Sequence, residues 1–369
     1  MTSQVTVGFP RMNKEKAEKR VFLPAFIQHL SRLAEIFLEE DYGSPANLSF
    51  DDYRQGNPKV HEVSREEAFQ KDYVVVLRSP SDEEFKLMRS GACLISMLHF
   101  PTRPRRVEIL KELNIHAISM DSVVDDGNMR LVENMRAVAW NGLEAGFDIL
   151  ERDCPDLLQE RDPFRVVILG TGMVGKHAVE AATKLGNIER NNRHMAQQGP
   201  GSIAMCIGRN FTRWSDEVNM LFHQTDILVD ATSRRNPSQA LVPNAWLGWL
   251  PRHAVIVDLA VDPYLLDHNP PTVRGIEGIP QGNLDKYIFM PDDPDWAVGI
   301  PPSIPSQNRR ALASCYSWPG IHPEACMEHY ARQLEPLMEV LLTRPFESLT
   351  LEGDYFARAL ARAKLPDLA

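Results

Sequence analysis

Apolar residues in the first 135 positions form short runs separated by segments with helical spacing. Runs typical of buried strands occupy residues 5–10, 72–80, 92–100 and 116–123. Residues 25–40 are amphipathic and predict a helix, as do residues 104–114. Strands that alternate with helices favour a mostly parallel sheet covered by helices. This part of the chain therefore predicts a first α/β domain.

The pattern resumes after a predicted helix at 135–150 and a polar, Pro-punctuated linker at 151–163. Strand candidates follow at residues 164–169, 202–209, 225–232 and 254–262. Residues 263–306 are rich in Pro, Gly and Asp and predict loops. Helical spacing returns at 322–342, where an apolar stripe predicts a face that packs on a core. Its members are Leu334, Leu337, Met338 and Leu341.

A glycine-rich turn joins the strand at 164–169 to the next helical pattern. Gly170 allows a sharp turn, Gly172 leaves room for a pyrophosphate, and Gly175 allows the helix to pack closely on the strand. The helix N-terminus would offer N–H groups and a positive dipole end to the phosphates. Residues of this loop are therefore predicted to bind a dinucleotide, namely Gly170, Thr171, Gly172, Met173, Val174 and Gly175. The alternative is a tight turn without a ligand.

Composition excludes several classes of partner. The net charge is −10, whereas a nucleic-acid-binding face needs an excess of clustered Lys and Arg. No apolar run reaches the length of a membrane span and the N-terminus has no apolar signal segment, so we expect a cytoplasmic protein without a membrane partner. The five cysteines lack CxxC spacing, which favours free thiols, and the apolar or small neighbours of Cys93, Cys206 and Cys315 predict that these three are buried. No His/Asp/Glu cluster has metal-ligand spacing. We expect no metal.

Four segments together resemble the alanine dehydrogenase and pyridine-nucleotide transhydrogenase family. Residues 18–27 (EKRVFLPAFI) resemble the segment whose arginine holds the substrate carboxylate, here Arg20. Residues 74–100 resemble a strand, acidic helix and strand that end in a histidine, here His99. The glycine loop and the 254–262 segment, which ends in Asp262, follow in the family's order.

The resemblance implies an architecture and a set of roles. It implies an α/β fold of two Rossmann-like domains with parallel sheets and a cleft between them. The substrate domain would comprise residues 1–138 and 303–369, and the dinucleotide domain residues 139–302. Arg20 would bind a carboxylate, His99 would shuttle protons near neutral pH, and Asp262 would orient an amine or stabilise a cationic imine. The family also implies a homo-oligomer.

Each of these residues has an ordinary structural interpretation when it is taken alone. His99 would be a partly buried histidine at a strand end, and Arg20 a surface residue in an ion pair. Asp262 would cap the turn that Pro263 favours.

Two departures from the family bear on the substrate. Arg78 stands where the alanine dehydrogenases have a lysine, and its wider fork suits a second carboxylate or a bulkier oxo group. The family's Asn-Met-Pro is replaced by Gly299, Ile300 and Pro301, so an amide that would contact ligand is missing. Alanine itself is therefore the less expected substrate.

A third departure bears on the cofactor. An acid normally ends the second strand of a dinucleotide domain and accepts hydrogen bonds from the ribose 2′-hydroxyl of NAD. Here Gly208, Arg209 and Asn210 stand at that place. Because Arg209 suits a 2′-phosphate, we expect NADP in preference to NAD. The alternative is that Arg209 is a surface charge.

The sequence thus predicts an NAD(P)-dependent oxidoreductase that acts at the C–N bond of a small-molecule amino acid or oxo acid. Three alternatives stay open. Residues 301–315 are similar to N5-(carboxyethyl)ornithine synthase, and saccharopine dehydrogenase performs comparable C–N chemistry on a related fold. These resemblances suggest an opine-type synthase that joins an oxo acid to an amine. A non-catalytic dinucleotide sensor and a transhydrogenase subunit are the others.

Overall fold

The computed structural model describes residues 4–12, 14–155, 162–208, 210–233 and 239–366. The chain divides into two compact units. Unit 1 consists of residues 1–14, 18–134 and 322–369, and unit 2 of residues 15–17 and 135–321. The short crossing at 15–17 is fixed by hydrogen bonds within unit 2, such as that from Ala17 N to Asp285 Oδ1 at 2.7 Å.

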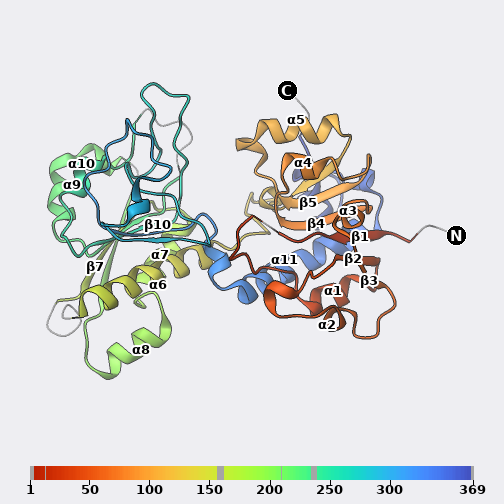
Figure 1. The fold of residues 1–369 in the computed structure, drawn as a ribbon, viewed down its shortest axis with the longest axis horizontal. Helices are drawn as coiled ribbons and strands as arrows, with labels where there is room; N and C mark the ends of the chain where they lie inside the picture. Colours follow the sequence, from red (N-terminus) through yellow and green to blue (C-terminus); the bar gives the residue numbers. More distant parts are fainter. Residues whose placement is uncertain (1–3, 13, 156–161, 209, 234–238, 367–369) are drawn as a thin grey trace. The chain divides into compact units, whose positions relative to one another are not determined.

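Unit 1 is built on a six-stranded, fully parallel sheet (Figure 1). Its order β3-β2-β1-β4-β5-β6 is that of a doubly wound sheet, in which ligands bind at the carboxyl ends near the switch point between β1 and β4. The strands are β1 (Thr6–Phe9), β2 (Glu35–Glu39), β3 (Val60–Val63), β4 (Tyr73–Arg78), β5 (Cys93–Met97) and β6 (His116–Ser119). The helices are α1 (Pro24–Leu30), α2 (Phe50–Arg54), α3 (Arg65–Phe69), α4 (Asp82–Phe85), α5 (Pro104–Glu112), α11 (Pro323–Thr343) and α12 (Tyr355–Arg362).

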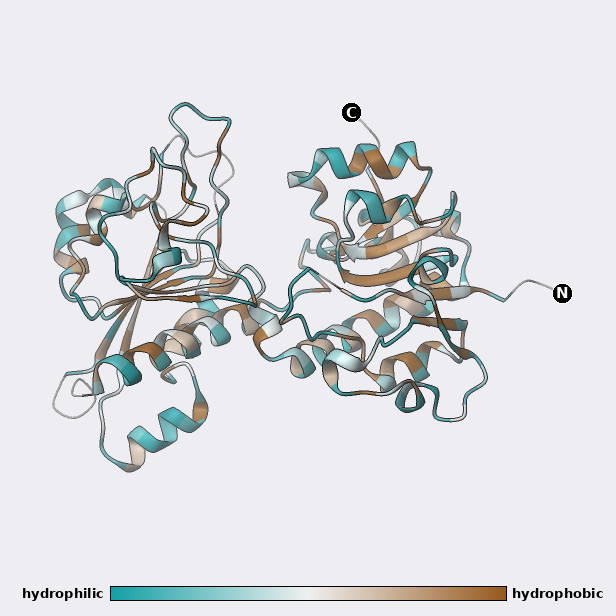
Figure 2. Cartoon of the chain, in the orientation of Figure 1, coloured by the Kyte–Doolittle hydropathy of each residue, from teal (hydrophilic) through white to brown (hydrophobic). Residues whose placement is uncertain are grey.

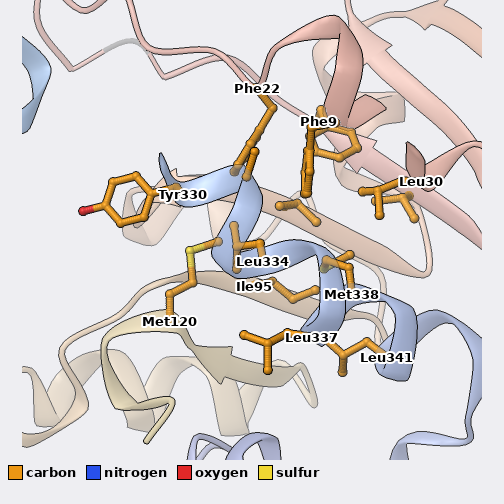
Figure 3. Close-up of a cluster of buried hydrophobic side chains, with 14 of the residues drawn as sticks. Phe9, Phe22, Leu30, Ile95, Met120, Tyr330, Leu334, Leu337, Met338 and Leu341 are labelled. Atoms are coloured by element: carbon orange, nitrogen blue, oxygen red, sulfur yellow. The ribbon is translucent and has the colours of Figure 1, made fainter. Parts of the chain in front are cut away.

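The strands β1, β4, β5 and β6 of this sheet are buried on both faces, which explains why they are nearly continuous apolar runs. On one face α1 and α11 pack against β1, β2 and β5; the stripe predicted in the sequence faces this core (Figure 3). Leu334, Leu337, Met338 and Leu341 lie there with Phe9 and Ile95. On the other face α3, α4 and α5 cover β4 and β5.

The predicted helix over residues 25–40 is wrong in its second half. The helix α1 ends at Leu30, and residues 35–39 form β2, which pairs with β1 and β3. Apolar residues change at this point from helical spacing to alternation, with Ile36 and Leu38 buried. A spacing of four residues fits both periods, so the pattern alone did not mark the change.

Unit 2 has a second six-stranded sheet, of order β11-β12-β10-β9-β7-β8, which is parallel except for β11. The strands are β7 (Phe164–Leu169), β8 (Ser202–Ile207), β9 (Ile227–Asp230), β10 (Val255–Asp258), β11 (Ile288–Phe289) and β12 (Ala311–Ser314). The helices are α6 (Met135–Asp153), α7 (Met173–Ala182), α8 (Ile188–Ala196), α9 (Ser215–Phe222) and α10 (Asn244–Leu247). Helices α6 and α7 cover one face, and α9 and α10 the other (Figure 1).

Hydropathy follows this layering, since the central strands of both sheets are hydrophobic and the outer helix faces are polar (Figure 2). The two parallel-dominated sheets confirm the predicted pair of Rossmann-like domains. The predicted cleft stays a prediction. Three of the five free cysteines are buried, Cys93, Cys315 and Cys326, whereas Cys206, expected among them, is only half-buried.

Candidate functional site

Two arginines of unit 1 converge on one carboxylate near the switch point of its sheet. Arg20, in the loop between β1 and α1, donates from Nε and Nη2 to the two oxygens of Glu18 at 2.8 and 2.5 Å. Arg78, the last residue of β4, donates from Nη1 to Glu18 Oε2 at 3.4 Å. The structure thus brings the two predicted substrate residues together, in a geometry that suits a carboxylate.

The ion pair between Glu18 and Arg20 is deeply buried, with 5% of each residue exposed. Burial alone would raise the pKa of the Glu18 carboxyl, but the hydrogen bond and the charge of Arg20 hold that pKa below its usual value. Burial lowers the pKa of Arg20, and Glu18 more than reverses this effect. Arg20 also hydrogen-bonds the thiol of Cys326 on α11. The expectation that Arg20 alone would be a surface residue is wrong.

His99 lies just beyond the carboxyl end of β5, the strand next to β4. Its Nδ1 is 3.2 Å from Oδ2 of Asp121, a residue that follows β6. Oδ1 of Asp121 accepts hydrogen bonds from the backbone N of His99 at 3.1 Å and from Ser119 Oγ at 2.7 Å. The side chain of His99 is 55% exposed while that of Asp121 is 8% exposed, so an ordered carboxylate orients a solvent-facing imidazole.

This pair has the arrangement of an oriented proton shuttle. An Nδ1–H donated to Asp121 leaves Nε2 with the lone pair that can take a proton. Burial would raise the pKa of Asp121, but its hydrogen bonds and charge attraction with His99 lower it, which keeps the carboxylate ionised. His99 also has a left-handed backbone, with φ of 52°, a conformation that costs energy for a residue with a side chain.

The glycine loop in unit 2 follows β7 at the switch point between β7 and β9. Gly170 has φ of +108°, and a Cβ there would lie 2.5 Å from the carbonyl oxygen of Ala231. A Cβ on Gly175 would lie 2.1 Å from the oxygen of Gly170. Both positions therefore require glycine for the fold itself.

Gly172 differs from its neighbours, because a Cβ there would meet nothing within 4 Å, and its φ of −74° suits any residue. It is the N-cap of α7, where N–H groups point outward. Thr171 and Met173 beside it are exposed, and Val174 is partly buried. The fold leaves an open cradle at the helix N-terminus, which fits a dinucleotide pyrophosphate.

The second strand of the dinucleotide motif is β8, which lies next to β7. Gly208 follows it, and a Cβ there would lie 3.8 Å from the Thr171 side chain, so this end of β8 adjoins the glycine loop. Arg209, on which the NADP preference depends, lies outside the described residues. Asn210 has a left-handed backbone.

Three acids gather beyond the carboxyl ends of β9 and β10. Asp230 and Asp258 end these strands and are register partners, 1% and 4% exposed. A Cβ on Gly275 would lie 2.5 Å from Asp230 Oδ2 and 3.8 Å from Asp262 Oδ2, so Asp262 adjoins the same point. The prediction that Asp262 ends the strand is wrong: β10 ends at Asp258, whose carboxylate accepts the N–H groups of Ala260 and Val261 and turns the chain.

The remaining predictions concern groups outside these clusters. Ile300, at the family's ligand-contacting position, is 9% exposed and packs in an apolar cluster with Trp296 and Ile304. In the described part of the chain, no group of three or more His, Cys, Asp or Glu residues has an arrangement that holds a metal ion. None of the helices in the described ranges is long and apolar enough to cross a membrane.

Sequence reasoning missed Glu18, Asp121, Asp230 and Asp258. Glu18 stands two residues before Arg20, and Asp121 lies near the end of the predicted strand at 116–123, so both had a local signal. Asp230 and Asp258 lie inside the predicted strands at 225–232 and 254–262, but their pairing depends on strand order.

Comparison with known proteins shows which family the chain resembles. Residues 10–139 match the model of the "Alanine dehydrogenase/PNT, N-terminal domain". Over residues 10–139, the chain is therefore similar to the N-terminal domain of the alanine dehydrogenase/PNT family. This confirms the resemblance drawn from the motifs.

Similarity to individual members of the alanine dehydrogenase/PNT family is low. The chain is 23% identical over 192 residues to the NAD(P) transhydrogenase subunit alpha of Haemophilus influenzae, a match that covers 50% of this chain and 37% of the relative. It is 21% identical over 207 residues to the alanine dehydrogenase of Methanococcus maripaludis, covering 52% and 54%. The matched part therefore spans only about a third to a half of these relatives.

Solved structures show the same fold over the whole chain. An L-alanine dehydrogenase superposes with a TM-score of 0.70 at 22% identity, covering 98% of this chain and 94% of the other. A transhydrogenase from Sinorhizobium meliloti superposes with a TM-score of 0.58 at 15% identity, covering 91% and 94%. These matches establish the fold.

Proposed function

We propose that the protein is an oxidoreductase that uses a nicotinamide dinucleotide and acts at the C–N bond of a small amino acid or oxo acid. The observation that carries the proposal is the constellation at the carboxyl edge of the sheet in unit 1. There Arg20 and Arg78 bind a carboxylate, and the neighbouring strand end carries His99, oriented by Asp121. Relatives named alanine dehydrogenase support this reaction class.

In this proposal each residue has one task. An incoming substrate carboxylate would compete with Glu18 for the N–H donors of Arg20 and Arg78. His99 Nε2 would take a proton from the amine or from water during deamination and return it during amination, while Asp121 holds the ring in one tautomer. Asp262 would stabilise the cationic imine.

Unit 2 would hold the dinucleotide. Its pyrophosphate would lie in the open cradle at Gly172, against the N-terminus of α7. The bound nicotinamide would supply the acceptor or donor of a hydride at the substrate carbon. We favour NADP, because residues 208–210, directly after β8, include Arg209 and no acid.

Gly172 offers a test of dinucleotide binding with a matched control. Gly172→Ala and Gly201→Ala both add a methyl group to open space, where nothing lies within 4 Å. Only Gly172 lies at the carboxyl end of the sheet, so only Gly172→Ala should weaken binding of NADPH and NADH in a fluorescence titration, with both variants as stable as the wild type. Equal affinities in the two variants, or no binding by the wild type, would contradict the site.

Turnover is tested with amino acids plus the oxidised dinucleotide, and with oxo acids plus ammonia and the reduced form. We expect His99→Gln to reduce kcat by about 10²–10⁴-fold while dinucleotide affinity is kept. Binding by the wild type without turnover on any of these substrates would favour the sensor alternative.

One observation favours a second candidate, an opine-type synthase. Arg78 gives the site a second guanidinium beside Arg20, and such a reaction brings two carboxylates to one site. If turnover needs an oxo acid together with an amino acid rather than with ammonia, this candidate replaces simple deamination. Arg78→Lys should then raise KM for one of the two substrates only.

A further inference from the structure

The turn that leads from β10 to Asp262 contains an unusual backbone conformation. Val261 has φ of +46°, in the left-handed region. This region is a strained one for a β-branched residue, because its side chain crowds the backbone. Asp262 follows directly, so the direction of its side chain depends on Val261 keeping this conformation.

The carboxyl group of Asp258 holds the turn in place. Its Oδ1 accepts hydrogen bonds from the backbone N of Ala260 at 3.1 Å and of Val261 at 2.8 Å. The group is anchored from the other side by Ser314 Oγ, which donates to Oδ2 at 3.2 Å. The indole of Trp318 donates to the backbone oxygen of Asp258 at 2.9 Å. These contacts fix the Asp258 carboxylate, whose hydrogen bonds offset the energetic cost of the left-handed backbone at Val261.

Asp230 stands beside Asp258 as its register partner on β9. Oδ1 of Asp230 accepts from the backbone N and the hydroxyl of Thr232, at 2.9 and 2.7 Å. Its Oδ2 and the Oδ2 of Asp262 both lie near Gly275, at 2.5 and 3.8 Å from the place that a Cβ on this glycine would take. Burial first, and the Asp230 carboxylate second, raise the pKa of Asp258 to about 7. The other acids facing it are Asp262 and the phenol Tyr264, while β12 presents Ser314.

We infer that Asp258 is a positioning residue for Asp262: its Oδ1 holds Val261 in the left-handed conformation and thereby fixes the 259–262 turn. The inference rests on the proposed function only for the catalytic use of Asp262. A proton on Oδ2 of Asp258 leaves Oδ1 free to accept hydrogen bonds. The turn therefore persists whether or not the pair of Asp230 and Asp258 carries a proton.

The test uses variants of both partners. Asp258→Leu removes the acceptor, whereas Asp258→Asn keeps an oxygen at Oδ1. Val261→Gly removes the strain, because glycine adopts a positive φ freely. Asp258→Leu should therefore destabilise the protein markedly less in the Val261→Gly background than in the wild type, as measured by denaturant unfolding. Equal costs in both backgrounds would overturn the inference.

Hydrogen exchange gives a readout of the turn itself that does not need activity. We expect amide exchange at residues 259–262 to rise about tenfold or more in Asp258→Leu and to stay near the wild-type rate in Asp258→Asn. If Asp258→Leu does not fold, Val261→Gly alone decides. It should stabilise the protein, whereas Val298→Gly, at an exposed valine with φ of −67°, should not.

Kinetics then connect the turn with the proposed function. Asp258→Leu should lower kcat as much as Asp262→Asn does, and Asp258→Asn should restore most of it, with KM for the dinucleotide unchanged in all three. The positioning role would be overturned if Asp258→Asn keeps the wild-type exchange rate but does not restore kcat. A wild type without turnover would refute the proposed function, whereas unfolding and exchange would still decide the inference.

Discussion

Glu18 and Arg20 form a two-point ion pair, with Nε–Oε1 and Nη2–Oε2 separations of 2.8 and 2.5 Å, in which the side chains are 1% and 4% exposed. The pair shows what the arginine at this place recognises, since a carboxylate of the chain already fills its fork.

Breaking this pair from one side should be costly. Arg20→Met removes both guanidinium hydrogen bonds and leaves the buried Glu18 carboxylate with the 3.4 Å contact to Arg78 and the 3.0 Å bond from the backbone N of residue 20. We expect a loss of about 3–5 kcal/mol in the free energy of unfolding. The double variant Arg20→Met/Glu18→Leu should recover much of it. Denaturant unfolding measures both.

Arg89 provides the control for this prediction. Its ion pair with Asp72 is on the surface, with side chains 44% and 37% exposed, so Arg89→Met should cost about 0–1 kcal/mol. A similar cost for Arg20→Met and Arg89→Met would mean that the buried pair does not behave as the geometry requires.

Asp121 should make stability fall in acid. Its folded-state pKa is lowered through His99, so its contribution is present above the unfolded-state pKa of about 3.9 and lost as the pH falls toward the folded value. Asp121→Asn lacks this contribution. The stability difference between wild type and Asp121→Asn, from urea unfolding, should therefore be largest above about pH 5 and shrink as the pH falls through about 4 to about pH 3. A difference independent of pH would contradict the ion pair.

Asp258 should make stability fall as the pH rises. Its folded-state pKa is raised to about 7 by burial and by Asp230, so the stability it contributes is present below its unfolded-state pKa and lost as the pH rises through about 7. Asp230→Asn removes part of the cause and lowers the pKa of Asp258. Relative to the wild type, Asp230→Asn should therefore be more stable at about pH 8 than at about pH 5. Thermal unfolding at several pH values measures this, and a constant offset would count against the pairing of the two acids.

Two glycines of the loop should be essential for the fold. Gly170→Ala combines a positive φ with a contact of 2.5 Å to the backbone of Ala231, and we expect it to cost about 1–3 kcal/mol or more. Gly175→Ala forces a contact of 2.1 Å with the Gly170 carbonyl and should also be destabilising. Gly172→Ala should be neutral in the same unfolding experiment. Equal losses of stability at all three positions would contradict the distinction between Gly170 and Gly175, which the fold requires, and Gly172, which it leaves open.

Much of the fold could be predicted because its strands are buried on both faces and read as apolar runs. The run before Gly170 and the stripe on α11 are of this kind. The change from α1 to β2 could not be predicted from the period, since four-residue spacing fits both. The short β12 lies in a polar segment, and only its pairing with β10 makes it a strand.

The candidate site shows the same limit. His99 and Arg20 could be found because they stand in short segments of recognisable order. Their partners could not, because the contact between His99 and Asp121 depends on β5 lying beside β6. The pairing of Asp230 with Asp258 depends likewise on the order of β9 and β10.

The place of α11 in the chain sets the order in which the units can be completed during synthesis. The helix fills the core of unit 1 with Leu334, Leu337 and Met338 and contacts Arg20 through Cys326, yet it emerges from the ribosome after all of unit 2. Until then the part of the apolar sheet face in unit 1 that α11 covers stays exposed. Nascent chains halted before residue 322 should therefore contain a folded unit 2 and a unit 1 that awaits its last helix, and so be a target for chaperones.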